Sequence, residues 1–281
     1  MIRRVILLVL ALFALTPLVR AQGVWASDCF PIEKLPTELR SEAEQTLWKL
    51  LDSEALYTVV GGLKPMSGGF VSLYLSVEEP DRARLEALSK ILSALRCGDE
   101  VECALMPFAT VREGKRYAEA VVFRRSAMTR MLTTYPELFA PYGFAPATAS
   151  QPLAVALSIE HDLTSARNRG LGYLYGYPKS AVDFFVTSQD EYMKTKVITP
   201  RDFFQIPTVK SDTGTFVYAI PKGRSPSAED LKLKERAGKI LAEYRKRRVK
   251  YFGSGKHGPA ALLREWFQGA DGMCSPENAK F

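Results

Sequence analysis

The sequence predicts an α+β fold in which helices pack around a mostly antiparallel sheet, in a single compact domain. Of the 281 residues, 47% are hydrophobic and 25% are charged, which is typical of a globular chain with a sizeable core. Two segments have the pattern of β-hairpins, whose strands are antiparallel. Helices and strands also lack the regular alternation that a parallel, doubly wound sheet requires.

Helices are expected where apolar residues recur every three or four positions. Asp52 and Ser53 can cap one helix start, and Pro80, Pro152 and Pro178 suit the first turns of three others. The pattern predicts helices over residues 37–51, 56–60, 80–97, 126–135, 152–167, 178–186, 228–248 and 259–267.

Strands are expected where apolar and polar residues alternate. Residues 70–77 alternate in this way and predict a strand with one buried face. Residues 101–111 and 117–123 predict a hairpin joined by 112–116, and a second hairpin is predicted from residues 203–209 and 215–220. Residues 63–69 are expected to form a tight connection, and the segment 139–150, rich in proline and alanine, to form a loop.

The N-terminus has the pattern of a secretory signal peptide. Arg3 and Arg4 precede an apolar run over residues 5–15, and Ala21 offers a small residue for cleavage. The alternative is a retained anchor helix, but the run is short for a bilayer. Cleavage would remove residues 1–21 with three arginines and no acid, lowering the net charge from +7 to +4. We therefore expect an exported domain over 22–281, periplasmic or secreted, with no membrane span and no nucleic-acid partner.

Four cysteines in an exported chain first suggest disulfides. Cys97 and Cys103 flank a short loop, while Cys29 and Cys274 lie near the two ends of the mature chain. We therefore expect the pairs Cys97–Cys103 and Cys29–Cys274. A metal site is the alternative, but no Cys-x-x-Cys spacing supports it, so neither a metal nor a cofactor is predicted.

The segment 169–186 is the most informative stretch of the chain. Three glycines, three tyrosines and a proline lie within residues 169–178, just before a predicted helix. Glycines allow the backbone to pass close to another group, either the protein's own core or a ligand. We interpret the segment first as a structural turn. The alternative is a cleft for an anionic or sugar-like ligand, with candidate residues Arg167, Arg169, Tyr173, Tyr175, Tyr177, Lys179 and His161.

Three other patterns suggest chemistry but remain incomplete. His161 lies between two acids, yet consecutive helical residues point in different directions, so the three cannot form one acid–base site by themselves. The glycine-rich loop 253–258 resembles a phosphate loop, but it follows a helix and lacks a full P-loop pattern. The basic run 245–252 could contact lipid headgroups or cell-wall polymers, or it could be a solvated helix end.

Four short motifs occur in a familiar order. They are Gly62-Leu63-Lys64-Pro65, Val121-Val122-Phe123-Arg124, Tyr142-Gly143-Phe144 and Gly172-Tyr173-Leu174-Tyr175-Gly176-Tyr177-Pro178. This order resembles an uncharacterised bacterial family marked by a Gly-Leu-Lys-Pro turn, a Leu-Val-Tyr-Arg strand and a Leu-Gly-Tyr-Pro helix start. The resemblance covers residues 45–192 and implies no activity, since none is assigned to the family. The family carries a His-Glu pair where this chain has Arg169-Gly170 and generally lacks an export signal, so chemistry based on that pair is not expected.

Two functions remain open at this point. The first is a non-catalytic binding or envelope-associated domain, favoured because no complete catalytic signature such as Gly-x-Ser-x-Gly occurs. Its partner would be an anionic small molecule, a lipid headgroup or a cell-wall polymer. The second is an enzyme acting on an anionic or sugar-like molecule at a cleft near residues 161–183.

Overall fold

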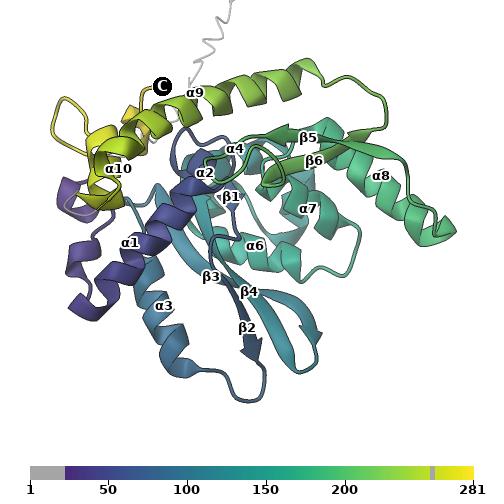
Figure 1. The fold of residues 1–281 in the computed structure, drawn as a ribbon. Coiled ribbons are helices and arrows are strands. Elements are labelled where there is room, and N and C mark those ends of the chain that lie inside the picture. Colours follow the sequence, from purple (N-terminus) through teal and green to yellow (C-terminus); the bar gives the residue numbers. More distant parts are fainter. Residues whose placement is uncertain (1–22, 254–256) are drawn as a thin grey trace, which may run out of the picture.

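The structure is a computed structural model that describes residues 23–253 and 257–281. The predicted signal peptide and residues 254–256 of the glycine-rich loop lie outside these ranges. Within them, the predicted α+β class is confirmed: helices surround one four-stranded and one two-stranded sheet, and both sheets are antiparallel (Figure 1).

The main sheet is built on its central strand, β4 (Lys115–Arg124). Strand β3 (Val101–Arg112) pairs with β4 at both ends, with a register shift between Pro107 and Val111, so β1 (Met66–Ser67) and β2 (Ser72–Ser76) share the opposite edge. The hairpin predicted from residues 101–123 is confirmed. Its turn consists of Glu113 and Gly114, both with positive φ (51° and 70°), as a tight two-residue hairpin requires.

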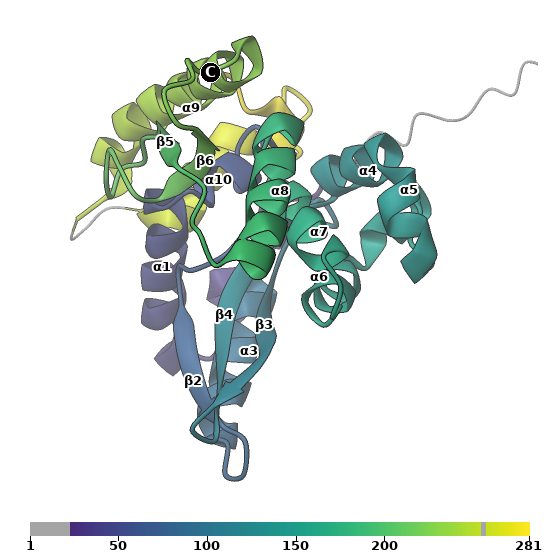
Figure 2. The same ribbon diagram turned by 90° about the vertical axis from the view of Figure 1, so that its right-hand side faces the viewer.

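Two hydrophobic clusters cover the two faces of this sheet. Successive side chains of a strand point to opposite faces, so Val122 belongs to one cluster and its neighbour Val121 to the other. Figure 2 shows helices α1 and α3 near one face and α6 and α7 near the other. The lower ends of β2, β3 and β4 extend beyond the helices α6–α8.

The first cluster is formed mainly by helices at both ends of the chain. They are α1 (Thr37–Asp52), α2 (Leu56–Val59), α3 (Arg82–Ala94), α9 (Ala228–Tyr251) and α10 (Gly258–Phe267). All five predicted helices are confirmed here. Short 3₁₀ turns occupy Ala26–Asp28, Ile32–Lys34 and Pro276–Asn278. Asp81 caps α3 by accepting a hydrogen bond from the Arg84 amide at 2.9 Å.

The second cluster is formed by the middle of the chain. It contains α4 (Arg125–Thr134), α5 (Pro136–Phe139), α6 (Pro152–Glu160), α7 (Ala166–Leu174) and α8 (Lys179–Thr195), with 3₁₀ turns at Ala140–Tyr142 and Pro146–Ser150. The single helix predicted over 152–167 is wrong. The chain turns after Glu160, where Asp162 Oδ1 accepts a hydrogen bond from the Thr164 amide at 2.6 Å and favours a turn over a continued helix.

The two-stranded sheet is the second predicted hairpin. Strands β5 (Arg201–Ile206) and β6 (Phe216–Pro221) pair antiparallel, with Phe204 opposite Tyr218. This hairpin lies between α9 and α8 (Figure 1). The Lys210 amide, between the two strands, donates a hydrogen bond at 3.0 Å to the carbonyl of Asp52 at the end of α1.

The structure contains one disulfide, and it differs from both predicted pairs. Cys29 is bonded to Cys97, while Cys103 and Cys274 are thiols. Cys29 and Cys97 face each other in an isolated antiparallel bridge, whereas Cys103 is held within β3 opposite Val122. The predicted pairs Cys97–Cys103 and Cys29–Cys274 are therefore wrong, because backbone pairing brings Cys97 to Cys29.

Candidate functional site: an aromatic cleft

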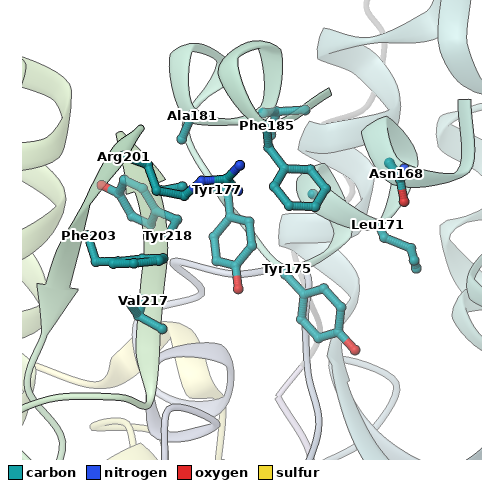
Figure 3. A pocket seen from close by; sticks show the side chains of 13 residues that line it. Asn168, Leu171, Tyr175, Tyr177, Ala181, Phe185, Arg201, Phe203, Val217 and Tyr218 are labelled. Atoms are coloured by element: carbon teal, nitrogen blue, oxygen red, sulfur yellow. The ribbon is translucent and has the colours of Figure 1, made fainter. Parts of the chain in front are cut away.

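A cleft of about 370 Å³ separates helices α7 and α8 from the β5–β6 hairpin (Figure 3). We call it the aromatic cleft. It is lined by Asn168, Leu171, Gly172, Tyr175, Tyr177, Ala181, Val182, Phe185, Arg201, Phe203, Val217, Tyr218 and Ala219. Its two walls come from segments on either side of the α8–β5 connection.

Glycines set the position of the helical wall. A Cβ atom on Gly170 would lie 2.7 Å from Ile159 Cγ2, and one on Gly172 would lie 2.8 Å from Val182 Cγ2. The absence of side chains at these positions therefore allows α7 to pack closely against α6 and α8. At these glycines the backbone therefore approaches the protein's own core and not a ligand. Residues 169–174, however, form part of helix α7 and not a turn.

The turn itself is confined to the residues after α7. Gly176 adopts a φ of +72°, and a Cβ there would lie 2.9 Å from Lys64 Cα. Pro178 is the residue just before α8, which begins at Lys179. This geometry directs Tyr175 and Tyr177 into the aromatic cleft (Figure 3).

Aromatic rings form the floor and mouth of the cleft. The Tyr177 ring lies 6.2 Å from that of Tyr175 and 5.5 Å from that of Tyr218, measured between centroids. Phe185 and Phe203 are 41% and 59% exposed, and they stand on opposite sides of Tyr177 (Figure 3). Their exposed faces are available to stack on a flat ligand.

Arg201 is the charged side chain among the cleft residues. Its Nε donates a hydrogen bond to the Thr199 carbonyl at 3.1 Å. Within the described ranges, no carboxylate lies within ion-pair distance of its guanidinium. Figure 3 shows the guanidinium projecting toward Tyr177 and Phe185. Arginine binds carboxylates, sulfonates and phosphates through paired N–H groups, so the cleft offers one anion-binding group.

The cleft tyrosines act as neutral groups near pH 7. Burial raises the pKa of Tyr175 and Tyr177, and nearby carboxylates such as Glu54 add to the rise. Burial also raises the pKa of Tyr218, whose hydroxyl donates a hydrogen bond to Asp230 at 2.7 Å. The lining residues include no histidine, cysteine, lysine or carboxylate. The polar side chains that line the cleft are therefore those of Arg201, Asn168 and the tyrosines.

Two of the seven predicted ligand-binding residues line the aromatic cleft, namely Tyr175 and Tyr177. Tyr173 is buried and stacks on Tyr135, with ring centroids 3.8 Å apart. His161 is exposed at the end of α6 and does not line the cleft. The structure therefore does not bring the histidine together with the tyrosines.

The three predicted cations, Arg167, Arg169 and Lys179, are neutralised elsewhere. Arg167 donates to the buried Glu160 carboxylate at 2.7 Å, which in turn accepts from the Ala109 amide. Arg169 and Lys179 both pair with Asp183. Burial alone would raise the pKa of Asp183, but hydrogen bonds from these two cations lower it below its usual value. None of the three cations lines the cleft.

Sequence reasoning missed Arg201, Phe203, Phe185 and Tyr218 as cleft residues. Phe185 lies within the predicted helix 178–186, and Arg201 lies just outside the predicted strand 203–209. The available signal was alternation: Arg201 and Phe203 share one face of β5, opposite to the buried Phe204.

The basic run at the end of α9 is largely paired with acids. Arg248 donates two hydrogen bonds of 2.8 Å to the Asp52 carboxylate. Arg247 lies 2.7 Å from Glu243 and 3.2 Å from Glu265. This pairing supports the solvated helix end over a polyanion-binding surface. The described part of the glycine-rich loop follows helix α9, as expected, rather than a strand.

Among the residues that the structure describes, no three histidine, cysteine or acidic side chains are grouped to hold a metal ion. No helix in the same ranges is long and apolar enough to cross a membrane. Comparison of the chain with protein-family models, with curated proteins and with solved structures found no match. The resemblance to an uncharacterised bacterial family stays a prediction.

Proposed function

We propose that this chain is an exported, non-catalytic binding protein whose aromatic cleft takes a small molecule with a flat apolar body and an acidic group. One observation carries the proposal: Arg201 projects into a cleft of aromatic rings without a carboxylate partner among the described residues. A bound anion would supply that partner.

The size and lining of the cleft support a small ligand. Its volume of about 370 Å³ lies in the range of about 300–1,000 Å³ that is usual for ligand sites. Phe185 and Phe203 offer exposed ring faces at the mouth, and Tyr177 offers a third ring between them. A planar apolar body would be stacked between the two walls, and its displacement of water would drive binding.

Arg201 would select ligands by charge. An ion pair gains strength as water is excluded, so an anion between these rings would interact with Arg201 more strongly than on an open surface. Asn168 lies on the opposite wall and can donate or accept a hydrogen bond at the far end of the ligand.

Export is supported by two independent features. The N-terminal pattern of Arg3, Arg4 and the apolar run 5–15 is typical of a signal peptide. The Cys29–Cys97 disulfide is a bond that persists in oxidising compartments. An exported binding protein of this type would meet its ligand outside the cytoplasm.

The proposal is tested with 1-anilinonaphthalene-8-sulfonate, an anion with a flat apolar naphthalene ring, whose fluorescence rises on binding. The protein without residues 1–21 is titrated with this probe and with neutral N-phenyl-1-naphthylamine. Arg201→Met should weaken binding of the anion by roughly tenfold, the effect of one lost charge-assisted contact. It should leave binding of the neutral amine nearly unchanged.

Two variants complete the design. Phe203→Ala removes an exposed stacking ring and should weaken both probes. Arg224→Met removes an exposed arginine outside the cleft and should weaken neither, which controls for net charge. Equal binding of the sulfonate by the wild type and Arg201→Met would contradict the proposed role of the cleft.

A further inference from the structure

The far end of the main sheet carries an open aromatic surface, formed by Tyr74, Phe108 and Tyr117. Tyr74 of β2 lies directly opposite Tyr117 of β4, and their ring centroids are 5.2 Å apart. The ring of Phe108, from β3, lies 5.3 Å from that of Tyr117. Tyr74 is 73% exposed, so most of its ring is available for contact.

This surface continues a sheet face that is otherwise covered. Further along β4, Val121 and Phe123 point to the same face as Tyr117 and are fully buried in the second cluster. Coverage of this sheet face by the second cluster ends near Glu119, which is only partly buried. Beyond it, β2, β3 and β4 extend past α6 and α7 (Figure 2). The three rings thus lie where the sheet extends past its helical cover, with Tyr74 exposed and Phe108 and Tyr117 half-buried.

Polar groups border the rings on the inner side. Tyr117 Oη lies 3.0 Å from Ser72 Oγ and 2.5 Å from Glu119 Oε1. Ser72 and Glu119 are opposite each other in the strand register. A carboxylate has about four acceptor positions, so Glu119 retains capacity for donors from a ligand.

The charges around the tip of the sheet cancel. Arg112, Lys115 and Arg116 carry positive charge, while Glu78, Glu79 and Glu113 carry negative charge. The loop after β2 and the β3–β4 turn are adjacent, since the Val77 amide donates to the Gly114 carbonyl at 2.9 Å. Arg116 also donates hydrogen bonds to the backbone carbonyls of Phe108 and Ala109, at 2.7 and 2.9 Å. This balance does not suit a polyanion such as single-stranded nucleic acid, which requires a positive surface.

We propose that this surface binds a neutral, β-1,4-linked glycan, with one sugar ring stacked on Tyr74. The face of a tyrosine ring carries negative partial charge, and the flat C–H face of a β-pyranose is complementary to it. The sugar hydroxyls are donors for the acceptors of Glu119 and Ser72. The Tyr117 ring is tilted by 49° from that of Tyr74, and Phe108 by 41° from Tyr117, so these two rings border the stacked sugar from the side. The inference is independent of the aromatic cleft.

The test measures binding of chitohexaose and cellohexaose to the protein without residues 1–21 by calorimetry. The wild type should bind at least one of these oligosaccharides. Tyr74→Ala should weaken that binding by roughly tenfold, while Tyr74→Phe should retain it, because the ring face is kept. Tyr192→Ala removes a tyrosine from α8, away from the sheet, and should have no effect.

Four outcomes decide the question. Loss of glycan binding in Tyr74→Ala, with an unchanged circular dichroism spectrum, supports the proposal. Absence of binding to both oligosaccharides overturns it. Binding of a dT oligonucleotide in their place would overturn it too. Self-association that depends on Tyr74, seen by light scattering without glycan binding, would instead assign the exposed edge of β2 to a second copy. Arg201→Met should bind the glycan as the wild type does, which separates this site from the cleft.

Discussion

Replacing Glu54 with glutamine tests the buried ion pair behind the aromatic cleft. Lys64 is fully buried, and its Nζ lies 2.7 Å from Glu54 Oε2. The rings of Phe216 and Tyr175 lie 4.3 and 5.8 Å from the same nitrogen. Glu54 favours the charged form of Lys64 through attraction between the two charges and through their close side-chain contact.

The structure sets the expected size of the effect. Glu54→Gln leaves a buried ammonium without its counter-charge, and breaking a buried pair in this way costs about 3–5 kcal/mol. Because the Glu54 side chain keeps 16% exposure, we expect the lower end of that range, about 3 kcal/mol. The neutral double variant Lys64→Met/Glu54→Gln should be more stable than Glu54→Gln alone, because it buries no unpaired charge.

The loss should also depend on pH in a defined direction. Burial lowers the pKa of Lys64 below its usual value, and Glu54 partly offsets this. Between the folded and unfolded pKa values the unfolded chain binds more protons, so stability from this group rises with pH. Removing Glu54 lowers the pKa of Lys64 in the folded protein further. The pH range over which stability rises therefore begins at a lower pH. The deficit of Glu54→Gln should therefore shrink as pH rises.

Urea unfolding between about pH 6.5 and pH 9.5 measures both effects. The matched control is Glu235→Gln, which breaks the exposed Lys239–Glu235 pair of α9 and should cost less than about 0.5 kcal/mol. A destabilisation by Glu54→Gln below about 1 kcal/mol, or a deficit that does not change with pH, would refute the reasoning.

Two further predictions concern the backbone and the disulfide. Gly176→Ala should destabilise the protein by at least about 1 kcal/mol more than Gly143→Ala, as measured by urea unfolding. Both glycines have positive φ (+72° and +79°), but only at Gly176 does a Cβ meet backbone, Lys64 Cα at 2.9 Å. Equal effects would show that the close approach is unimportant. Reduction of Cys29–Cys97, which joins positions 68 residues apart, should lower the unfolding free energy by about 3–4 kcal/mol. Thiol titration of the unreduced, unfolded protein should detect Cys103 and Cys274 alone, and a count of four thiols would contradict the pairing.

Local patterns predicted most of the elements. The β3–β4 hairpin follows from alternation and from glycine at the turn, and α3 follows from its apolar stripe and its N-terminal Asp81. These features depend on residues close in sequence, so one chain is enough to find them. The break after Glu160 is also local, but the capping role of Asp162 competes with a helical pattern that continues to Arg167.

Long-range pairing could not be predicted in the same way. Cys29 meets Cys97 because the N-terminal segment runs beside the end of α3, which no local pattern encodes. The site shows the same limit. Tyr175 and Tyr177 were found from their own segment, whereas Arg201 and Phe203 reach the cleft only because the second hairpin folds back beside α8.

The position of the hairpin has a consequence for its motion. An isolated pair of strands is only marginally stable, so β5–β6 depends on contacts with its neighbours. One of its faces forms a wall of the cleft, where Phe203 contacts no close-packed core and remains 59% exposed. A ligand held between Phe203 and Phe185 would fasten the hairpin to α8. Local opening of β5 and β6 would then require release of the ligand. Bound ligand would therefore slow amide hydrogen exchange more in these two strands than in the rest of the chain.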